Sequence, residues 1–218
     1  LALAGDIDAA TARPLVERWF GDIPRGPEVR QPAAGPVTLP APVREVMTDQ
    51  VPVVRIHRTW TGPALADPEA VALALGMHVL GGLESSRLET ALVRGEQLAV
   101  AVSAASQQHE QLGFLRTMMD VKPGVDPAEA EKRFDAVIAR LLAEGPTADE
   151  LQRAATQLVS AMIGALEQVG GFSGKGATLA EGLLYAGDPA HYKAELRQLA
   201  ALTPAQVQSA LQRWLGRP

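Results

Sequence analysis

Apolar residues alternate with polar ones, or form short uninterrupted runs, in five stretches of the chain, and both patterns are typical of β-strands. The predicted strands are residues 1–4, 43–49, 51–60, 98–104 and 113–121. The last two strands flank the polar stretch SQQHEQ and are predicted to form a hairpin.

A second pattern repeats every three to four residues and predicts helices. The predicted helices cover 9–20, 68–80, 86–94, a segment from 127 to the EGPTADE stretch, 148–169, a segment ending at 185, one that starts near 188, and 204–215. Most of these helices begin at a residue that can cap an N-terminus, and several carry proline at the first position or a capping-box glutamate or glutamine. The predicted caps are Asp8, Asp67, Asp126, Thr147 and Thr203.

Strands and helices come in pairs along the chain instead of alternating strictly. This order predicts an α+β fold in which an antiparallel sheet is packed against helices, and it favours that fold over a doubly wound parallel sheet. Residues 24–42 contain six prolines and are predicted to be an extended surface connector. We therefore expect one domain over 1–218, with a lead-in strand and helix (1–23), the connector (24–42) and a main body (43–218).

Charge and composition exclude several classes of protein. The net charge is −5 and the longest run of basic residues is the pair at 132–133, so we expect no nucleic-acid partner. No apolar run approaches the ~20 residues of a membrane helix, so we expect no membrane insertion. Cysteine is absent, which removes disulfides and thiolate ligands. The first residue is not methionine and lies in an apolar run, so we interpret the chain as a fragment of a longer protein.

The four histidines do not have the spacing of a catalytic zinc site. Neither H-E-x-x-H nor H-x-x-E-H occurs at His57, His78, His109 or His191. We therefore expect this chain to bind no metal and to carry no catalytic residue.

Two glycine-rich stretches, GGLESSRL (81–88) and GGFSGKG (170–176), are the remaining candidates for chemistry. Neither matches the G-x-S-x-G turn of a serine hydrolase, and neither has the lysine spacing and preceding strand of a phosphate loop. The first stretch is predicted to end one helix, with Ser85 or Ser86 capping the next. An anion or nucleotide binder that uses these loops stays open as an alternative.

Taken together, several segments resemble the insulinase/pitrilysin family of zinc peptidases. The segments are GDIDAATARPLVERWFGDIPRG, HVLGGLESSRLETALVRGEQLAVAVSA, KPGVDPAEAEKRFDAVIARLLAEGPTADELQRA, LEQVGGFSGKGATLAEGLLYAGDPAHY and ALTPAQVQSALQRWL. They cover essentially the whole chain and resemble the second, zinc-free domain of a two-domain module in that family.

The resemblance implies a non-catalytic domain that forms part of the wall of a peptide chamber. Zinc would be bound by an H-x-x-E-H motif in a preceding domain, and this chain would contribute to proteolysis only with that domain and a second module or subunit. The family's Arg and Tyr clamp falls on Val93 and Val100, so the clamp is absent. Contacts with the substrate chamber or the peptide would come from the loops, at Gly81, Gly82, Ser85, Ser86, Arg87, Gly170, Gly171, Phe172 and Lys175.

The resemblance also suggests a bacterial, periplasmic parent, although the sequence fixes no compartment. A second interpretation stays open beside the peptidase domain. The chain could belong to a non-proteolytic assembly subunit of the same fold, like the family's respiratory-complex core proteins.

Overall fold

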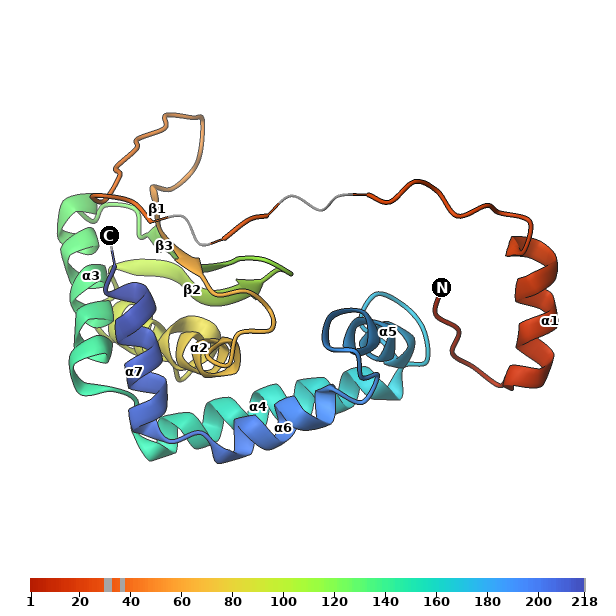
Figure 1. Cartoon of the computed structure of the whole chain (residues 1–218). Coiled ribbons are helices and arrows are strands. Elements are labelled where there is room, and N and C mark those ends of the chain that lie inside the picture. The colour runs from red at the N-terminus through yellow and green to blue at the C-terminus, as the bar shows by residue number, and fades with distance from the viewer. Residues whose placement is uncertain (30–32, 36–37, 218) are drawn as a thin grey trace. The chain divides into compact units, whose positions relative to one another are not determined.

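The computed structural model describes residues 1–29, 33–35 and 38–217, and the chain divides into two compact units (Figure 1). Unit 1 comprises Leu1–Ala34 and Ala161–Tyr192, and unit 2 comprises Gly35–Ser160 and Lys193–Pro218.

A three-stranded antiparallel sheet forms the centre of unit 2. Its strands are β1 (Arg55–Gly62), β2 (Ala99–Gln108) and β3 (Gly113–Val121), in the order β1-β3-β2. Strands β2 and β3 form the predicted hairpin, and a bulge interrupts their register near residues 99–101. The predicted α+β fold with an antiparallel sheet is confirmed.

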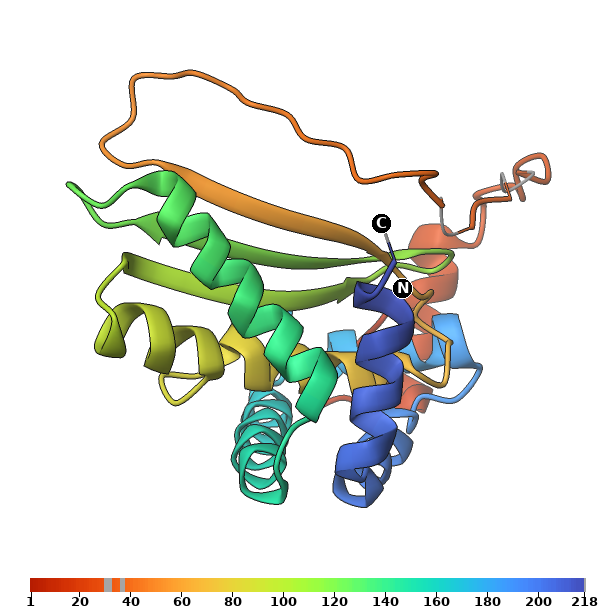
Figure 2. The same cartoon turned by 90° about the vertical axis from the view of Figure 1, so that its left-hand side faces the viewer.

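The two faces of the sheet differ in burial. Along β3, Leu115, Thr117, Met119 and Val121 are buried, whereas Arg116 between them is exposed. Because side chains alternate between faces along a strand, these four residues lie on one face, which the helices cover. Figure 2 shows the green helix α3 (Pro127–Glu144) crossing the sheet beside the dark blue helix α7 (Pro204–Leu215).

The core of unit 2 lies between that face and the surrounding helices. Helix α2 (Ala70–Met77) continues into the π-helical turn η1 (His78–Gly82), and a second π-helical segment, η2 (Glu89–Gly95), precedes β2. Helices α2 and α7 pack so closely that a Cβ at Gly76 would lie 2.9 Å from the Leu211 side chain. The largest fully buried side chains are Phe134, Leu73, Leu75, Met77, Leu80, Leu88, Leu92, Leu115, Met119, Leu141, Leu211 and Val79.

Several helix starts have the predicted caps. Asp126 caps α3 by accepting a hydrogen bond from the backbone N–H of Ala128, and Thr203 and Gln206 form a capping box at the start of α7. Thr147 and Glu150 form another at the start of α4 (Ala148–Glu167). These caps satisfy N–H groups that have no partner within the helix. Helix α6 (Tyr192–Ala201) precedes α7.

An ion-pair network joins β1 to α3. Arg58 donates to Glu131 and Asp135, and Arg44 from the segment before β1 also donates to Glu131. These two guanidinium groups hold the pKa of Glu131 at about 2.

Unit 1 contains α1 (Ala9–Phe20) and α5 (Lys175–Ala186). Asp8 caps α1 as predicted, through the backbone N–H of Thr11. The apolar stripe of α1 has no buried residue, and Trp19 is 69% exposed. Neither α1 nor α5 buries a side chain fully, so the described part of unit 1 has little core.

Four predictions about local structure are wrong. Residues 1–4 and 43–49 form no strand. Strand β1 begins at Arg55, four residues after the predicted start at 51, and α2 begins at Ala70, two residues after the predicted start at Pro68. A strand requires a hydrogen-bonded neighbour, and Pro52, which has no N–H to donate, follows the second of these segments. The side chain of Asp67 accepts a hydrogen bond from the N–H of Glu69, and this bond holds residues 67–69, just before α2, in a turn.

The proline-rich connector is only partly described. Residues 30–32 and 36–37 lie outside the described residues, and the rest of 24–42 contains neither helix nor strand.

Candidate functional site

The first glycine-rich stretch packs tightly against its neighbours in unit 2. A Cβ at Gly81 would lie 2.7 Å from the backbone nitrogen of Ala104 in β2, and one at Gly82 would lie 2.4 Å from the imidazole Nδ1 of His78. Both distances are shorter than van der Waals contact. Close packing of η1 therefore accounts for these glycines without a ligand.

The two serines that follow differ in exposure. Ser85 is exposed, whereas Ser86 is 2% exposed and its hydroxyl has no hydrogen-bond partner among the described residues. Ser85 or Ser86 was predicted to cap the next helix, and the Ser86 alternative is therefore wrong. A buried hydroxyl without a base beside it does not have the geometry of an activated nucleophile.

Arg87 lies at the end of this stretch and is fully engaged by the protein. Its guanidinium donates to both carboxylate oxygens of Glu150, at 2.8 Å each, and to the backbone carbonyl of Gly145 at 2.7 Å. Burial by itself would raise the pKa of Glu150, but hydrogen bonds from Arg87 and Thr147 lower it to about 2. The same pair raises the pKa of Arg87, so both groups are charged at neutral pH.

The two clamp positions lie on different elements. Val93 is half-buried in η2, and Val100 is 50% exposed at the start of β2. Neither aliphatic side chain can donate a hydrogen bond to a peptide.

The second glycine-rich stretch connects α4 to α5 in unit 1. Gly171 has a φ of +88°, a conformation that favours glycine, and Phe172 beside it is fully exposed. The loop closes where the N–H of Lys175, the first residue of α5, donates to the carbonyl of Gln168 at 2.7 Å. Gly170 is exposed, and its carbonyl lies 2.3 Å from where a Cβ of Gly174 would be.

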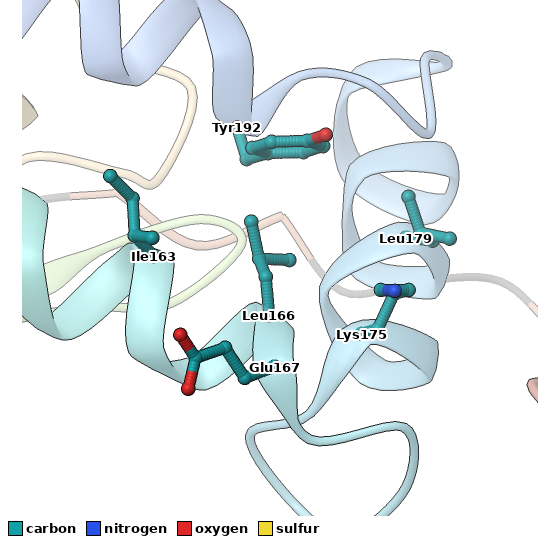
Figure 3. A pocket seen from close by; sticks show the side chains of 6 residues that line it. All are labelled: Ile163, Leu166, Glu167, Lys175, Leu179 and Tyr192. Carbon is teal, nitrogen blue, oxygen red and sulfur yellow. The ribbon is translucent and has the colours of Figure 1, made fainter.

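A shallow pocket of about 380 Å³ lies beside this loop (Figure 3). Its six lining residues come from the C-terminal part of α4, the first turns of α5 and the start of α6, and all belong to unit 1. They are Ile163, Leu166, Glu167, Lys175, Leu179 and Tyr192.

Of these six residues, only Lys175 was a candidate from the sequence. The other five are separated by up to 29 positions, and nothing in a single sequence shows that α4, α5 and Tyr192 enclose a common space. The available signal was an amphipathic helix followed directly by a glycine-rich loop.

The histidines lie on separate elements: His57 in β1, His78 in η1, His109 between β2 and β3, and His191 before α6. Over 1–29, 33–35 and 38–217, no group of three His, Cys, Asp or Glu side chains is arranged to hold a metal ion. Within the same ranges, no helix combines the length and apolar character needed to cross a bilayer.

Several solved structures have a fold similar to that of this chain. A protease from Helicobacter pylori superposes with a TM-score of 0.80 at 19% identity, over 97% of this chain and 51% of that one. The Peptidase M16 inactive domain from Pseudomonas fluorescens gives 0.67 at 21% identity, over 96% and 48%. The inactive peptidase domain of a protein assigned as a zinc protease, from Bordetella parapertussis, gives 0.65 at 22% identity, over 78% and 89%.

The chain therefore spans about half the length of the Helicobacter and Pseudomonas chains that it matches. No curated protein matches it in sequence. Residues 1–158 match the family model described as Peptidase M16 inactive domain. This match confirms the resemblance to the zinc-free domain of the insulinase/pitrilysin peptidases, and neither the assembly subunit nor the anion binder is favoured. The chain belongs to the Peptidase M16 inactive domain family and is a non-catalytic domain of that type.

Proposed function

We propose that this chain is a wall domain of a zinc metalloendopeptidase and acts in proteolysis only together with a domain that carries H-x-x-E-H. In this proposal residues 1–218 act as one domain, which packs beside the zinc domain and borders the space that holds the peptide. The match to an inactive-domain family carries the proposal. This chain covers only about half of the Helicobacter and Pseudomonas chains, which therefore have room for one more domain of ordinary size, and this also supports the proposal.

The division of labour follows from the side chains. Metal-assisted peptide hydrolysis needs ligands for the metal, a general base and groups that stabilise the developing oxyanion. In the described ranges this chain offers no such ligand group, and Val93 and Val100 stand at the clamp positions. Zinc and its ligands would therefore come from the partner domain. This chain would supply a rigid surface and loop contacts from the exposed candidate residues of the two glycine-rich stretches, which are Ser85, Gly170, Gly171, Phe172 and Lys175.

The proposal is tested by reconstitution. The chain is mixed with the H-x-x-E-H domain that the proposal assigns to the same parent protein, and zinc content and cleavage of an unstructured fluorogenic peptide are measured for each part and for the mixture. We expect about one zinc per zinc domain, none held by this chain alone, and cleavage only in the mixture.

Two results would overturn the proposal. One is stoichiometric zinc or cleavage with this chain alone. The other is a parent sequence without an H-x-x-E-H motif, which would indicate the non-proteolytic assembly subunit instead. Alanine replacement of the first His of that motif is the control, because it should remove cleavage while leaving the two domains associated.

A further inference from the structure

The pocket beside the α4–α5 loop combines an apolar floor with two opposite charges. Figure 3 shows Leu166 between α4 and α5, with the Tyr192 ring above it and Leu179 on the far side. Ile163 extends the apolar surface along α4. The pocket has a volume of about 380 Å³, at the lower end of the roughly 300–1,000 Å³ range of small-ligand pockets.

Glu167 and Lys175 lie on opposite sides of Leu166 (Figure 3). Both residues are exposed, and neither forms an ion pair with any part of the chain that the structure describes. Within the protein, Arg87 and Glu150 show the usual arrangement, in which opposite charges near an apolar surface meet each other. Here the two charges are held apart by Leu166 and remain available to a ligand.

These features select the chemistry of the ligand. A molecule that fits must be small and apolar at its centre, and it must carry a cation at one end for Glu167 and an anion at the other for Lys175. A short apolar peptide with free termini has this pattern, because its ammonium and carboxylate groups are separated by aliphatic side chains. The apolar ring of Tyr192 suits contact with the aliphatic side chains of such a peptide, and this contact does not use the hydrogen bonds of the Tyr192 hydroxyl.

We propose that this pocket binds short apolar peptides through both of their charged ends, with the ammonium group at Glu167 and the carboxylate at Lys175. The proposal rests on the proposed function in one respect, since a wall domain of a peptidase meets peptides. It goes further by naming a site, its residues and a preference for short fragments over long chains.

The test uses the whole chain and three probes: trileucine, N-acetyl-trileucine and trileucine amide. Binding is followed by calorimetry and by shifts of backbone amide signals in NMR spectra. We expect saturable binding of trileucine, with shifts at Leu166, Lys175 and Tyr192. Each blocked probe should bind about three- to fivefold more weakly, as expected for one exposed ion pair.

Variants connect each end of the peptide to its partner. Glu167→Gln should weaken trileucine to the level of N-acetyl-trileucine and leave the acetylated probe unchanged. Lys175→Gln should weaken trileucine to the level of trileucine amide and leave binding of the amide unchanged. Leu166→Ala should weaken all three probes, whereas Leu183→Ala, an exposed leucine of α5 that does not line the pocket, should weaken none.

The proposal would be overturned if trileucine showed no saturable binding, if the blocked probes bound as well as trileucine, or if Leu183→Ala weakened binding as much as Leu166→Ala. Competition by phosphatidylcholine vesicles at the same residues would also overturn it, since it would indicate a zwitterionic lipid. Because binding is measured without the zinc domain, failure here leaves the reconstituted cleavage, and with it the proposed function, separately testable.

Discussion

Arg87 and Glu150, 63 positions apart, form a two-pronged ion pair whose side chains are only 16% and 17% exposed. The third hydrogen bond of Arg87 goes to the carbonyl of Gly145, at the end of α3. One guanidinium thus joins the segment before η2 to the connection between α3 and α4. Its main role in this chain is structural.

Removing this guanidinium should destabilise unit 2. Replacing Arg87 with Met leaves the Glu150 carboxylate largely buried without its partner, so we expect the free energy of unfolding to fall by about 2–4 kcal/mol. Arg87→Lys should recover only part of the loss, because an ammonium group cannot bind both oxygens and the carbonyl in the same geometry. Urea denaturation measures both changes. Arg140→Met is the matched control, since its pair with Glu144 is exposed and should contribute about 0.5 kcal/mol or less.

The pH dependence of stability should report the same pair. The folded-state pKa of Glu150, about 2, lies below its ordinary 4.5, so its stabilisation is fully present above about pH 4.5 and is lost as the pH falls toward 2. The shift corresponds to about 3 kcal/mol. We expect urea denaturation midpoints to fall steeply between pH 4.5 and 2.5, and less steeply in Glu150→Gln. Equal slopes in the two proteins would contradict the low pKa.

Adding a methyl group at two glycines should have opposite effects. Gly81→Ala places a Cβ against the backbone of Ala104, and we expect a loss of about 1–3 kcal/mol. Gly164→Ala lies in α4, where a Cβ meets nothing within 4 Å, and should raise helix stability by about 0.5–1 kcal/mol. Thermal unfolding followed by circular dichroism gives both values. A Gly81→Ala protein as stable as the parent would show that η1 and β2 can move apart.

Buried hydroxyl groups offer a route to higher stability. Thr117 is 1% exposed, and its hydroxyl has no hydrogen-bond partner among the described residues. Thr117→Val keeps the shape of the side chain and removes the unsatisfied group, so we expect a gain of about 1 kcal/mol. Thr156→Val, at an exposed site where the hydroxyl donates to the carbonyl of Gln152, should change stability by less than about 0.5 kcal/mol. A loss in Thr117→Val would instead indicate a buried water bound to that hydroxyl.

What the sequence predicted well was local. The caps at Asp126 and Thr203 depend on residues two to three positions away, and the hairpin depends on one short turn, so a single stretch of sequence contains the necessary information. The segment 43–49 has the alternation of a strand, but alternation does not show whether a neighbouring strand is there to pair with it.

The contacts that define the sites were not predictable in this way. The partner of Arg87 lies 63 positions along the chain, and the pocket joins residues of three helices. The family resemblance identified the domain type, because it depends on the combination of segments over the whole chain. It gave no information about the pocket, although one resembling segment, residues 166–192, contains every lining residue except Ile163.

The position of α7 has a consequence for the synthesis of the protein. Trp214 of α7 donates a hydrogen bond to Glu69, 145 positions earlier, and Leu211 fills the space beside Gly76 of α2. At about 5–20 residues per second, a ribosome needs roughly 7–30 s to make the chain between those partners. During that time the apolar face of α2 has no helix to cover it. Unit 2 is therefore expected to close its core only after α7 leaves the ribosome, and nascent chains stalled before α7 should be bound by chaperones.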